Sequence, residues 1–410
     1  MLSRPRDRPA AGAAVALVLA SILAGCASKT PNGARTAAPA ARSAGSKARD
    51  AASATTPATI PPTVATDSTI ATVAAPGPPS IPALDPPAPD TIPPFANPAD
   101  VVVAHPAATT DPQGNPMFPL TGLPAPSADA AGEAVLAVKI DNAAPARPQT
   151  GLDHADVIIE EVVEGGVTRF LALFQSQGSD PIGPIRSVRP VDPALLAPFG
   201  GAFAYSGGTK RFINGLRREP IADVGVDLLP SAYFRGTQAK APYNLYSRTS
   251  ALRAAMGATR APEQPWTFLD AAAPWSAVGA IPTDTYELQV SKVTRVRWRW
   301  DSAANAWERT TNGTVHVVRG GAAVVAENVV VIHVPYLDTT ATDASHAPVP
   351  EPAVLGAGPA TFLVDGMQSE GQWSKSAVAS PFSFTDSKGS TVALRRGVTW
   401  VLLAPTELPG

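Results

Sequence analysis

The chain has 410 residues, enough for two or three domains of ordinary size, and a formal net charge of −2. Only 16% of its residues are charged, so composition provides no basic surface of the kind that binds nucleic acid. The 45 prolines exceed ordinary usage, and the single cysteine excludes an internal disulfide, so the folded part depends on its hydrophobic core.

The first 26 residues have the pattern of a secretory signal peptide. Arg4, Arg6 and Arg8 precede the apolar run "AAGAAVALVLASILAGC", which is too short for a permanent transmembrane helix. The run ends in "LAGC", which resembles the lipobox of bacterial lipoproteins, in which the cysteine is lipidated and becomes the mature N-terminus. We therefore expect Cys26 to anchor an exported protein to the outer face of the cell membrane. An ordinary signal peptide with an incidental cysteine is the alternative.

Residues 27–114 are dominated by Ala, Pro, Thr and Ser, as in "ATIPPTVATDSTIATVAAPGPPS". Such a segment cannot bury enough apolar area to offset its chain entropy, so we expect it to be disordered. A flexible coil of ~90 residues spans roughly 50 Å r.m.s.. The predicted role is a tether that lets the folded part work well above the membrane.

Two folded units are predicted after the tether. Residues 115–275 mix strand-like runs such as "AVLAVKI" and "GAFAYS" with helix-like runs such as "DPALLAPF" and "SALRAAM". Residues 280–406 contain short β-branched and aromatic runs, among them "NVVVIHV" and "TWVLLA", separated by turn signals. The predicted class is α+β, with a mixed α/β domain followed by a mostly β domain.

The run "RVRWRW" in the second unit alternates Arg295, Arg297 and Arg299 with apolar residues. This alternation predicts a strand with one apolar and one basic face. An aromatic or basic platform for a glycan or an anionic wall polymer is the functional alternative. Trp373 and Trp400 have apolar neighbours, which predicts that both are core residues.

The stretch "VIIEEVVEGGVTRFLALFQ" places charged residues among residues typical of a core. Gly165-Gly166 predicts a hairpin with a two-residue turn, and a helix that ends at Gly165 is the competing interpretation. In that hairpin Glu160 and Glu164 share a face with Arg169, which lies diagonal to both. Such a group forms either a structural ion-pair cluster or a pair of carboxylates for acid–base catalysis, whose pKa values are pushed apart.

Further polar residues stand at strand ends and in loops, where α/β domains collect ligands. In "PIGPIRSVRPVD", Arg186 and Arg189 are suited to clamping a carboxylate or a phosphate, or to pairing with the glutamates. The other candidate ligand-binding residues are Asp141, Asn142, Arg147, Gln149, Thr168, Ser187 and Asn244. The five histidines show no metal-ligand spacing and no cofactor motif is present, so neither a metal nor a cofactor is predicted.

Several stretches of the chain, taken together, resemble the YerB-like family of bacterial lipoproteins, the DUF3048 family. The matching stretches of the first unit are "PLTGLP", "VKIDN", "ARPQTGL", "ADVIIEEVVEGGVTRFLALFQ", "IGPIRSVRP" and "APYNLYS". Those of the second are "RWDSAANAWERTTNG", "ENVVVIHVPY", "GPATFLVDG", "GQW" and "RRGVTWVLLAP". The resemblance implies an exported two-domain α+β lipoprotein and no established activity. This chain has Tyr243 where the family usually has histidine, which weighs against an enzyme that needs that group.

Three hypotheses follow from these observations. The first is a membrane-anchored protein that binds a cell-envelope component through a Glu/Arg/Asn cluster in the first unit. The second is an enzyme that acts on envelope glycan or peptide, with Glu160 or Glu164 as the acid–base group. The third is a scaffold for another envelope protein. The expected partners are the membrane, through a lipid on Cys26, and a cell-wall glycan, peptide or envelope protein, without nucleic acid.

Overall fold

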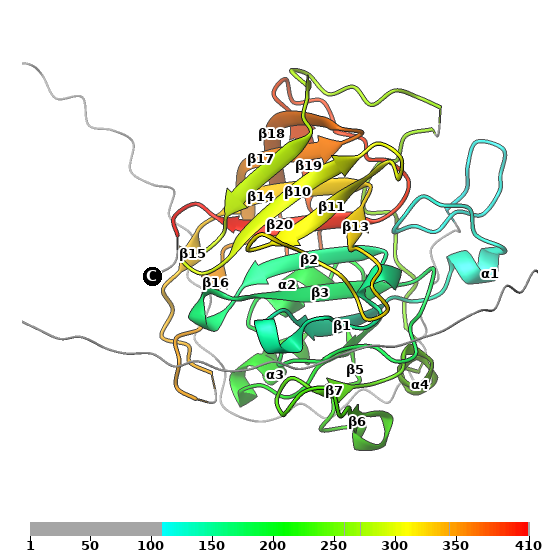
Figure 1. Cartoon of the computed structure of the whole chain (residues 1–410). Coiled ribbons are helices and arrows are strands. Elements are labelled where there is room, and N and C mark those ends of the chain that lie inside the picture. Colours follow the sequence, from blue (N-terminus) through cyan, green and yellow to red (C-terminus); the bar gives the residue numbers. More distant parts are fainter. Residues whose placement is uncertain (1–108, 258, 271, 344, 409–410) are drawn as a thin grey trace, which may run out of the picture. The chain divides into compact units, whose positions relative to one another are not determined.

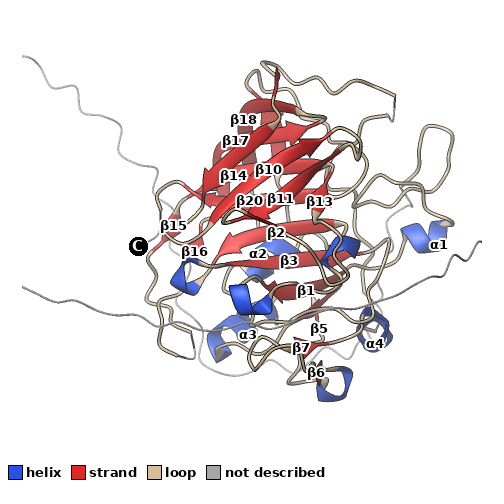
Figure 2. Ribbon diagram, in the orientation of Figure 1, coloured by secondary structure: helices blue, strands red, loops and turns tan. Residues whose placement is uncertain are grey.

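The computed structural model describes residues 109–408 except 258, 271 and 344. The expected signal peptide, Cys26 and residues 27–108 of the expected tether lie outside the described residues. Strands dominate the described part, and its helices are short (Figure 2). None of the helices in residues 109–408 is long and apolar enough to cross a membrane.

The helices all belong to the first predicted unit. The α-helices are α1 (Ala128–Ala131), α2 (Asp192–Leu196), α3 (Lys210–Leu216) and α4 (Thr249–Ala255). Short 3₁₀ turns cover Ala144–Ala146, Leu152–His154, Glu164–Gly166 and Pro230–Ala232.

The strands run through both units. Those of the first unit are β1 (Leu136–Asp141), β2 (Val157–Val162), β3 (Thr168–Phe174), β4 (Ala202–Ala204), β5 (Ala222–Asp223), β6 (Phe234–Arg235) and β7 (Leu245–Tyr246). Those that follow are β8 (Ile281–Pro282), β9 (Thr285–Gln289), β10 (Arg295–Asp301), β11 (Ala306–Thr311), β12 (Thr314–Val315), β13 (Val325–Ala326), β14 (Asn328–Val334) and β15 (Tyr336–Leu337). The last are β16 (Glu351–Pro352), β17 (Gly356–Val364), β18 (Met367–Lys375), β19 (Ser383–Asp386) and β20 (Thr399–Pro405).

A main sheet of eleven strands is continuous across both predicted units. Its order is β19-β18-β17-β14-β20-β2-β3-β1-β4-β5, and β8 pairs with β18. The last strand, β20, lies between β14 and β2 and is parallel to both. The sheet is mixed, because β3 is antiparallel to both of its neighbours, β2 and β1, while β4 is parallel to β1.

Two hydrophobic cores cover the two faces of the main sheet. On one face, Leu195 of α2 and Phe212 of α3 pack with Ile159 and Leu171 of the sheet. On the other, Trp298 of β10 packs against Trp400 of β20 with ring centroids 5.1 Å apart. Figure 1 shows β10 and β11 lying across β14 and β20. Because both faces are covered, β1 and β2 are buried along their whole length, their charged residues included.

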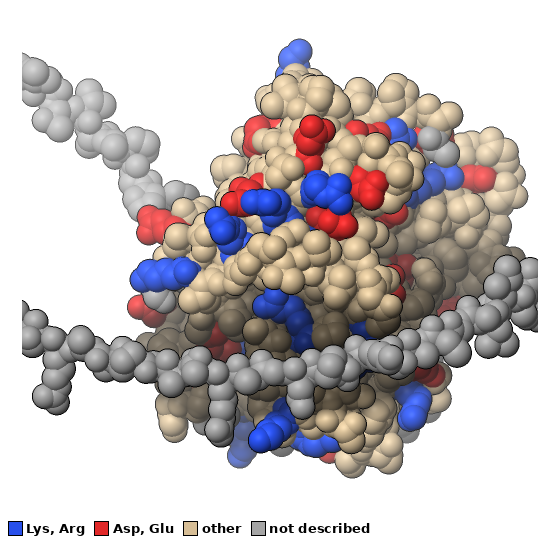
Figure 3. All heavy atoms as spheres, viewed as in Figure 1, with Lys and Arg blue, Asp and Glu red and all other residues tan. Residues whose placement is uncertain are grey.

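A second sheet, of order β12-β11-β10-β9 with β13 paired to β11, forms the outer layer. The alternation predicted for "RVRWRW" is confirmed: Val296 and Trp298 are buried, while the arginines beside them are exposed. Those arginines pair with Glu287 and Glu308, so positive and negative groups mix over this face (Figure 3). The predicted burial of Trp373 and Trp400 is confirmed as well.

Candidate functional site

Strands β2 and β3 form the predicted hairpin, but its predicted register is wrong by one residue. Glu164, Gly165 and Gly166 make a three-residue turn, closed by a 2.8 Å hydrogen bond from the Val163 N–H to the Val167 carbonyl. The expected turn had two residues, Gly165 and Gly166, whereas the observed turn also includes Glu164. The two glycines are left-handed, with φ values of 70° and 71°. Glu160 therefore pairs with Phe170, and Glu161 pairs with Arg169.

The shift changes which residues share a face of the sheet. A slip of one residue moves every side chain of a strand to the opposite face. Arg169 consequently shares its face with Glu161, and the predicted placement of Glu160 beside Arg169 is wrong. Glu164 and Arg169 do lie together, with Oε2 of Glu164 3.6 Å from Nη2 of Arg169. The two candidate carboxylates, Glu160 and Glu164, belong to separate clusters on opposite faces.

On the face covered by β10 and β11, Glu160 belongs to a closed ring of buried side chains, which we call the Arg309 ring. Its six members are Arg309, His316, Gln149, Asn142, Thr168 and Glu160, each at most 3% exposed. Arg309 donates from Nη2 to Oε1 of Glu160 at 2.5 Å, and Thr168 Oγ1 donates to the same oxygen at 2.7 Å. The indole N–H of Trp400 donates to the second oxygen of Glu160 at 3.0 Å. The carboxylate of Glu160 is therefore saturated and shielded from water.

The remaining bonds of the Arg309 ring run in one direction. Asn142 Nδ2 donates to Thr168 Oγ1 at 2.7 Å, and Gln149 Nε2 donates to Asn142 Oδ1 at 3.1 Å. His316 Nε2 lies 2.8 Å from Gln149 Oε1, and Arg309 Nη1 lies 2.8 Å from His316 Nδ1. Because Arg309 can only donate, Nδ1 of His316 accepts and its proton is on Nε2. Burial and the positive charges of Arg309 and Arg147 hold the pKa of His316 well below its usual value, so the ring needs a neutral imidazole.

On the opposite face of the sheet, Lys139, Glu161 and Asp192 form a buried lysine triad. The Lys139 ammonium contacts a carboxylate oxygen of Glu161 and lies 2.6 Å from Oδ1 of Asp192. Asp192, at the start of α2, also accepts a 2.7 Å hydrogen bond from the N–H of Arg189. Burial and the nearby Asp192 raise the pKa of Glu161 despite the Lys139 charge. These contacts fix α2 and the loop before it against β1 and β2.

Beside the lysine triad lies a partly exposed group, which we call the arginine cluster: Asp141, Glu164, Arg169, Arg186 and Arg189. Oε2 of Glu164 lies 2.6 Å from Arg189 Nη2 and 3.6 Å from Arg169 Nη2. Arg186 Nε lies 2.8 Å from Oδ2 of Asp141. The cluster thus joins the end of β1, the β2–β3 hairpin and the loop before α2.

Several polar atoms of the arginine cluster have no hydrogen-bond partner although they are buried. They are Nε of Arg169 and of Arg189 and Oε1 of Glu164, together with Nε of Arg186 and Oδ2 of Asp141, which are held only by the ion pair between them. Burial and the neighbouring Arg189 lower the pKa of Arg169 to about 10, so it is still charged at neutral pH. The side chain of Arg186 is 21% exposed and its guanidinium lies 5.6 Å from the ring centroid of Tyr243. This group can therefore meet a ligand from solvent through Arg186.

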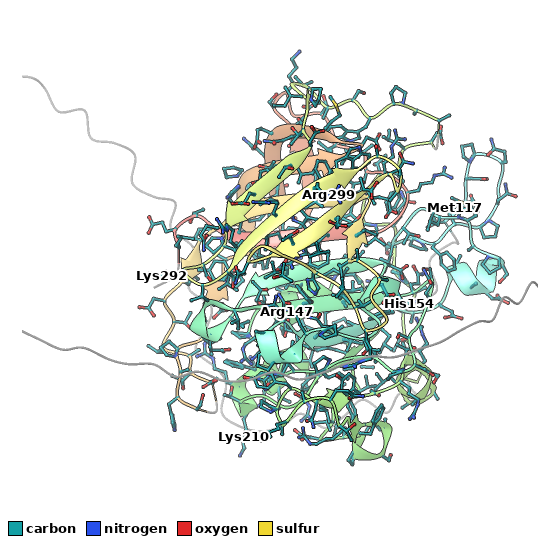
Figure 4. All side chains as sticks on the ribbon, in the orientation of Figure 1. Met117, Arg147, His154, Lys210, Lys292 and Arg299 are labelled. Atoms are coloured by element: carbon teal, nitrogen blue, oxygen red, sulfur yellow. The ribbon has the colours of Figure 1, made fainter. Side chains whose placement is uncertain are left out.

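The other predicted site residues are distributed around these clusters. Ser187 accepts from Arg169 Nη1 at 3.2 Å through its carbonyl. Arg147 follows the 3₁₀ turn at Ala144–Ala146 (Figure 4), and burial lowers the pKa of its guanidinium, whose Nε has no partner. Asn244 belongs instead to the small β6–β7 hairpin, where it accepts from Arg235 at 2.9 Å.

Sequence reasoning missed Arg309 and Asp192 and gave His316 no role. The signal at Arg309 is its phase in β11: it stands two residues after the buried Trp307 and so belongs to the apolar face of the strand. A charged residue on the buried face of a strand indicates that an oppositely charged partner is buried beside it. Asp192 shows no comparable signal, because an acidic residue in the first turn of a helix is common.

Two cavities lie away from the arginine cluster. One, of about 450 Å³, is lined mainly by the segment 175–180 and by Thr249, Ser250 and Arg253 near the start of α4. The other, of about 260 Å³, is lined by Trp266, Phe384 and polar neighbours. Within the described residues, no group of three or more His, Cys, Asp or Glu side chains is placed to hold a metal ion.

The described residues form a fold of mostly strands with a few short helices, in which one mixed sheet carries two buried charge clusters on opposite faces. Two family models match the chain: "Protein of unknown function (DUF3048) N-terminal domain" over residues 120–262 and the corresponding C-terminal domain over 286–401. Together they cover more than half of the chain, which belongs to the DUF3048 family.

A relative and a solved structure are similar to this chain. "Putative lipoprotein YerB" of Bacillus subtilis (strain 168) is 29% identical over 209 residues, which are 48% of this chain and 61% of that protein. The chain thus spans less than two thirds of that relative. The crystal structure of the YerB protein from Bacillus subtilis has a TM-score of 0.61 at 22% identity, covering 70% of this chain and 96% of that one. This likeness establishes a shared fold.

Proposed function

We propose that this protein is an exported lipoprotein, anchored by a lipid on Cys26, whose arginine cluster binds a component of the cell envelope. The name of the Bacillus subtilis relative and the lipobox-like "LAGC" support the anchoring. The Ala/Pro/Thr-rich segment that follows serves as the tether between membrane and folded part.

One observation carries the binding proposal. The three arginines of the cluster pair with Glu164 and Asp141, and several buried polar atoms of these five residues have no hydrogen-bond partner. The Arg309 ring also leaves one buried donor, Nε of Arg309, without a partner, but no member of that ring is more than 3% exposed. In the arginine cluster the unused hydrogen-bonding capacity lies next to Arg186, whose side chain is 21% exposed, and this combination supports a binding site.

The paired-carboxylate enzyme receives no support from the hairpin. Acid–base catalysis by Glu160 and Glu164 requires both groups beside one substrate, and the observed register separates them by the thickness of the sheet. Glu160 is also saturated by Arg309, Thr168 and Trp400. The proposed binding site is therefore the arginine cluster, and the Arg309 ring, which holds Glu160, is not part of it.

Retention on envelope material tests the proposal. The full chain, kept soluble in detergent, is mixed with fragmented cell wall and sedimented, and the retained fraction is measured. We expect saturable retention that falls in Arg186→Gln, because that side chain is the most exposed arginine of the cluster. Arg299→Gln is the matched control, since Arg299 is 52% exposed and pairs with Glu308 on the outer sheet.

Equal retention of the wild type, Arg186→Gln and Arg299→Gln would contradict binding at the arginine cluster. Absence of retention in all three would contradict envelope binding altogether. The anchoring is tested separately by Cys26→Ser in the producing bacterium, where the proposal predicts release of the protein from the membrane fraction.

A further inference from the structure

The arginine cluster holds more hydrogen-bond donors than its own partners use. The Nη atoms of Arg169 and Arg189 are engaged by Glu164 and by the carbonyls of Ser187 and Val188. The Nε atoms of Arg169 and Arg189 have no acceptor, although these residues are only 5% and 4% exposed. Burying a charged donor without a partner costs more than an ordinary hydrogen bond contributes. The arginine cluster therefore has buried donor groups that its own acceptors do not use.

The charges of the cluster point to the nature of that acceptor. Three guanidiniums, on Arg169, Arg186 and Arg189, share the carboxylates of Glu164 and Asp141. Their mutual repulsion is part of what lowers the pKa of Arg169. A negatively charged acceptor would reduce this repulsion and supply oxygen atoms to the unused N–H groups.

We propose that the ligand of the arginine cluster presents a single oxoanion, a carboxylate or a phosphate, to Arg169, Arg186 and Arg189. This inference rests on the proposed binding function and names the chemical class of the ligand. Guanidinium groups suit this class because their planar fork matches two oxygens of a carboxylate or a phosphate. A neutral ligand would leave the repulsion among the three arginines unchanged.

The different exposure of the three arginine side chains indicates from which side an oxoanion approaches the arginine cluster. The side chain of Arg186 is 21% exposed, against 6% for Arg169 and 4% for Arg189. The oxoanion therefore meets Arg186 first. The Tyr243 ring beside the Arg186 guanidinium restricts that side chain and helps to orient its fork.

Small anions test the inference without any envelope material. The full chain in detergent is titrated with inorganic phosphate and with acetate at constant ionic strength, and binding is followed by calorimetry. We expect saturable binding of at least one anion by the wild type, about tenfold or more weaker in Arg186→Gln. Arg186→Lys keeps the charge without the fork and should lie between the two, while Arg299→Gln should match the wild type. No saturable binding of either anion, or equal binding by Arg186→Gln, would overturn the inference.

The source of the oxoanion is resolved on the wall fragments. One sample is stripped of its phosphate polymers, and in a second the peptide carboxylates are converted to amides. Loss of retention in the first sample alone identifies a phosphate polymer, and loss in the second alone identifies a peptide carboxylate. Undiminished retention on both samples would leave the binding function intact and overturn the oxoanion. Anion binding without any retention would have the opposite meaning, with the oxoanion site upheld and the envelope function contradicted.

Discussion

Glu160 and Glu161 are consecutive residues of β2, yet their carboxylates lie on opposite faces of the main sheet and contact different cations. Glu160 pairs with Arg309 on the face covered by β10 and β11, and Glu161 pairs with Lys139 on the face covered by α2. All four side chains are at most 2% exposed. The hairpin thus connects the sheet to the layer above it and to the layer below it through buried ion pairs.

Removing one member of the buried pair between Glu160 and Arg309 should destabilise the protein strongly. Glu160→Gln keeps the shape of the side chain but leaves the buried Arg309 uncompensated. Breaking a buried pair in this way typically costs about 3–5 kcal/mol. Chemical denaturation of the full chain should therefore show a large fall in the free energy of unfolding.

Glu308→Gln is the matched control for that experiment. It makes the same chemical change in the outer sheet, where Glu308 pairs with Arg299 and the side chains are 18% and 52% exposed. Exposed pairs contribute about 1 kcal/mol or less. A similar loss of stability in the two variants would show that Arg309 is not left uncompensated when Glu160 is changed.

The hairpin illustrates how far the sequence could be interpreted. β-branched runs on both sides of Gly165 and Gly166 predicted the two strands correctly. The register depended on the turn length, and a Gly-Gly pair is compatible with a two-residue or a three-residue turn. A difference of one residue moved Glu160 to the opposite face and divided the predicted Glu/Arg/Asn cluster into the Arg309 ring and the arginine cluster.

Contacts between residues far apart in the chain could not be predicted from the sequence either. Glu160 and Arg309 are 149 positions apart, and Gln149 and His316 are 167 apart. Local patterns carry no information on such pairs, which depend on β20 inserting between β14 and β2. The convergence of Arg169, Arg186 and Arg189 was easier to anticipate, because these residues lie within 21 positions and flank neighbouring elements.

The Arg309 ring predicts a specific loss of stability in acid. His316 is neutral in the folded protein because its pKa is held well below the usual 6.5, whereas in the unfolded chain it gains a proton below that value. The unfolded state therefore binds more protons as the pH falls. The contribution of this residue is fully present above pH 6.5 and is lost at a rate that approaches about 1.4 kcal/mol per pH unit below it.

Two histidine variants isolate that contribution. His316→Gln can still accept from Arg309 and donate to Gln149 but cannot be protonated, so its stability should fall less steeply between pH 6.5 and pH 5. His154→Gln is the control, because the side chain of His154 is 44% exposed. Identical pH profiles for the wild type and His316→Gln would show that His316 does not titrate as the ring requires.

The two glycines of the hairpin turn should differ in their tolerance of a side chain. Both have positive φ, so alanine at either position costs about 1–2 kcal/mol in backbone strain. A Cβ at Gly165 would meet no atom within 4 Å, whereas one at Gly166 would lie 2.9 Å from Oγ of Ser291. That hydroxyl cannot move freely, because it donates to the Gly166 carbonyl and accepts from the N–H of Thr294 at 3.0 Å.

Gly166→Ala should therefore destabilise the protein by at least about 1 kcal/mol more than Gly165→Ala, since overpacking adds to the strain. Denaturant unfolding of the two variants measures the difference directly. The same contact ties the hairpin turn to the segment between β9 and β10, so the excess cost at Gly166 reports how firmly the outer sheet holds the turn that carries Glu164. Equal losses in the two variants would mean that Ser291 moves aside and that the turn is held from within the hairpin alone.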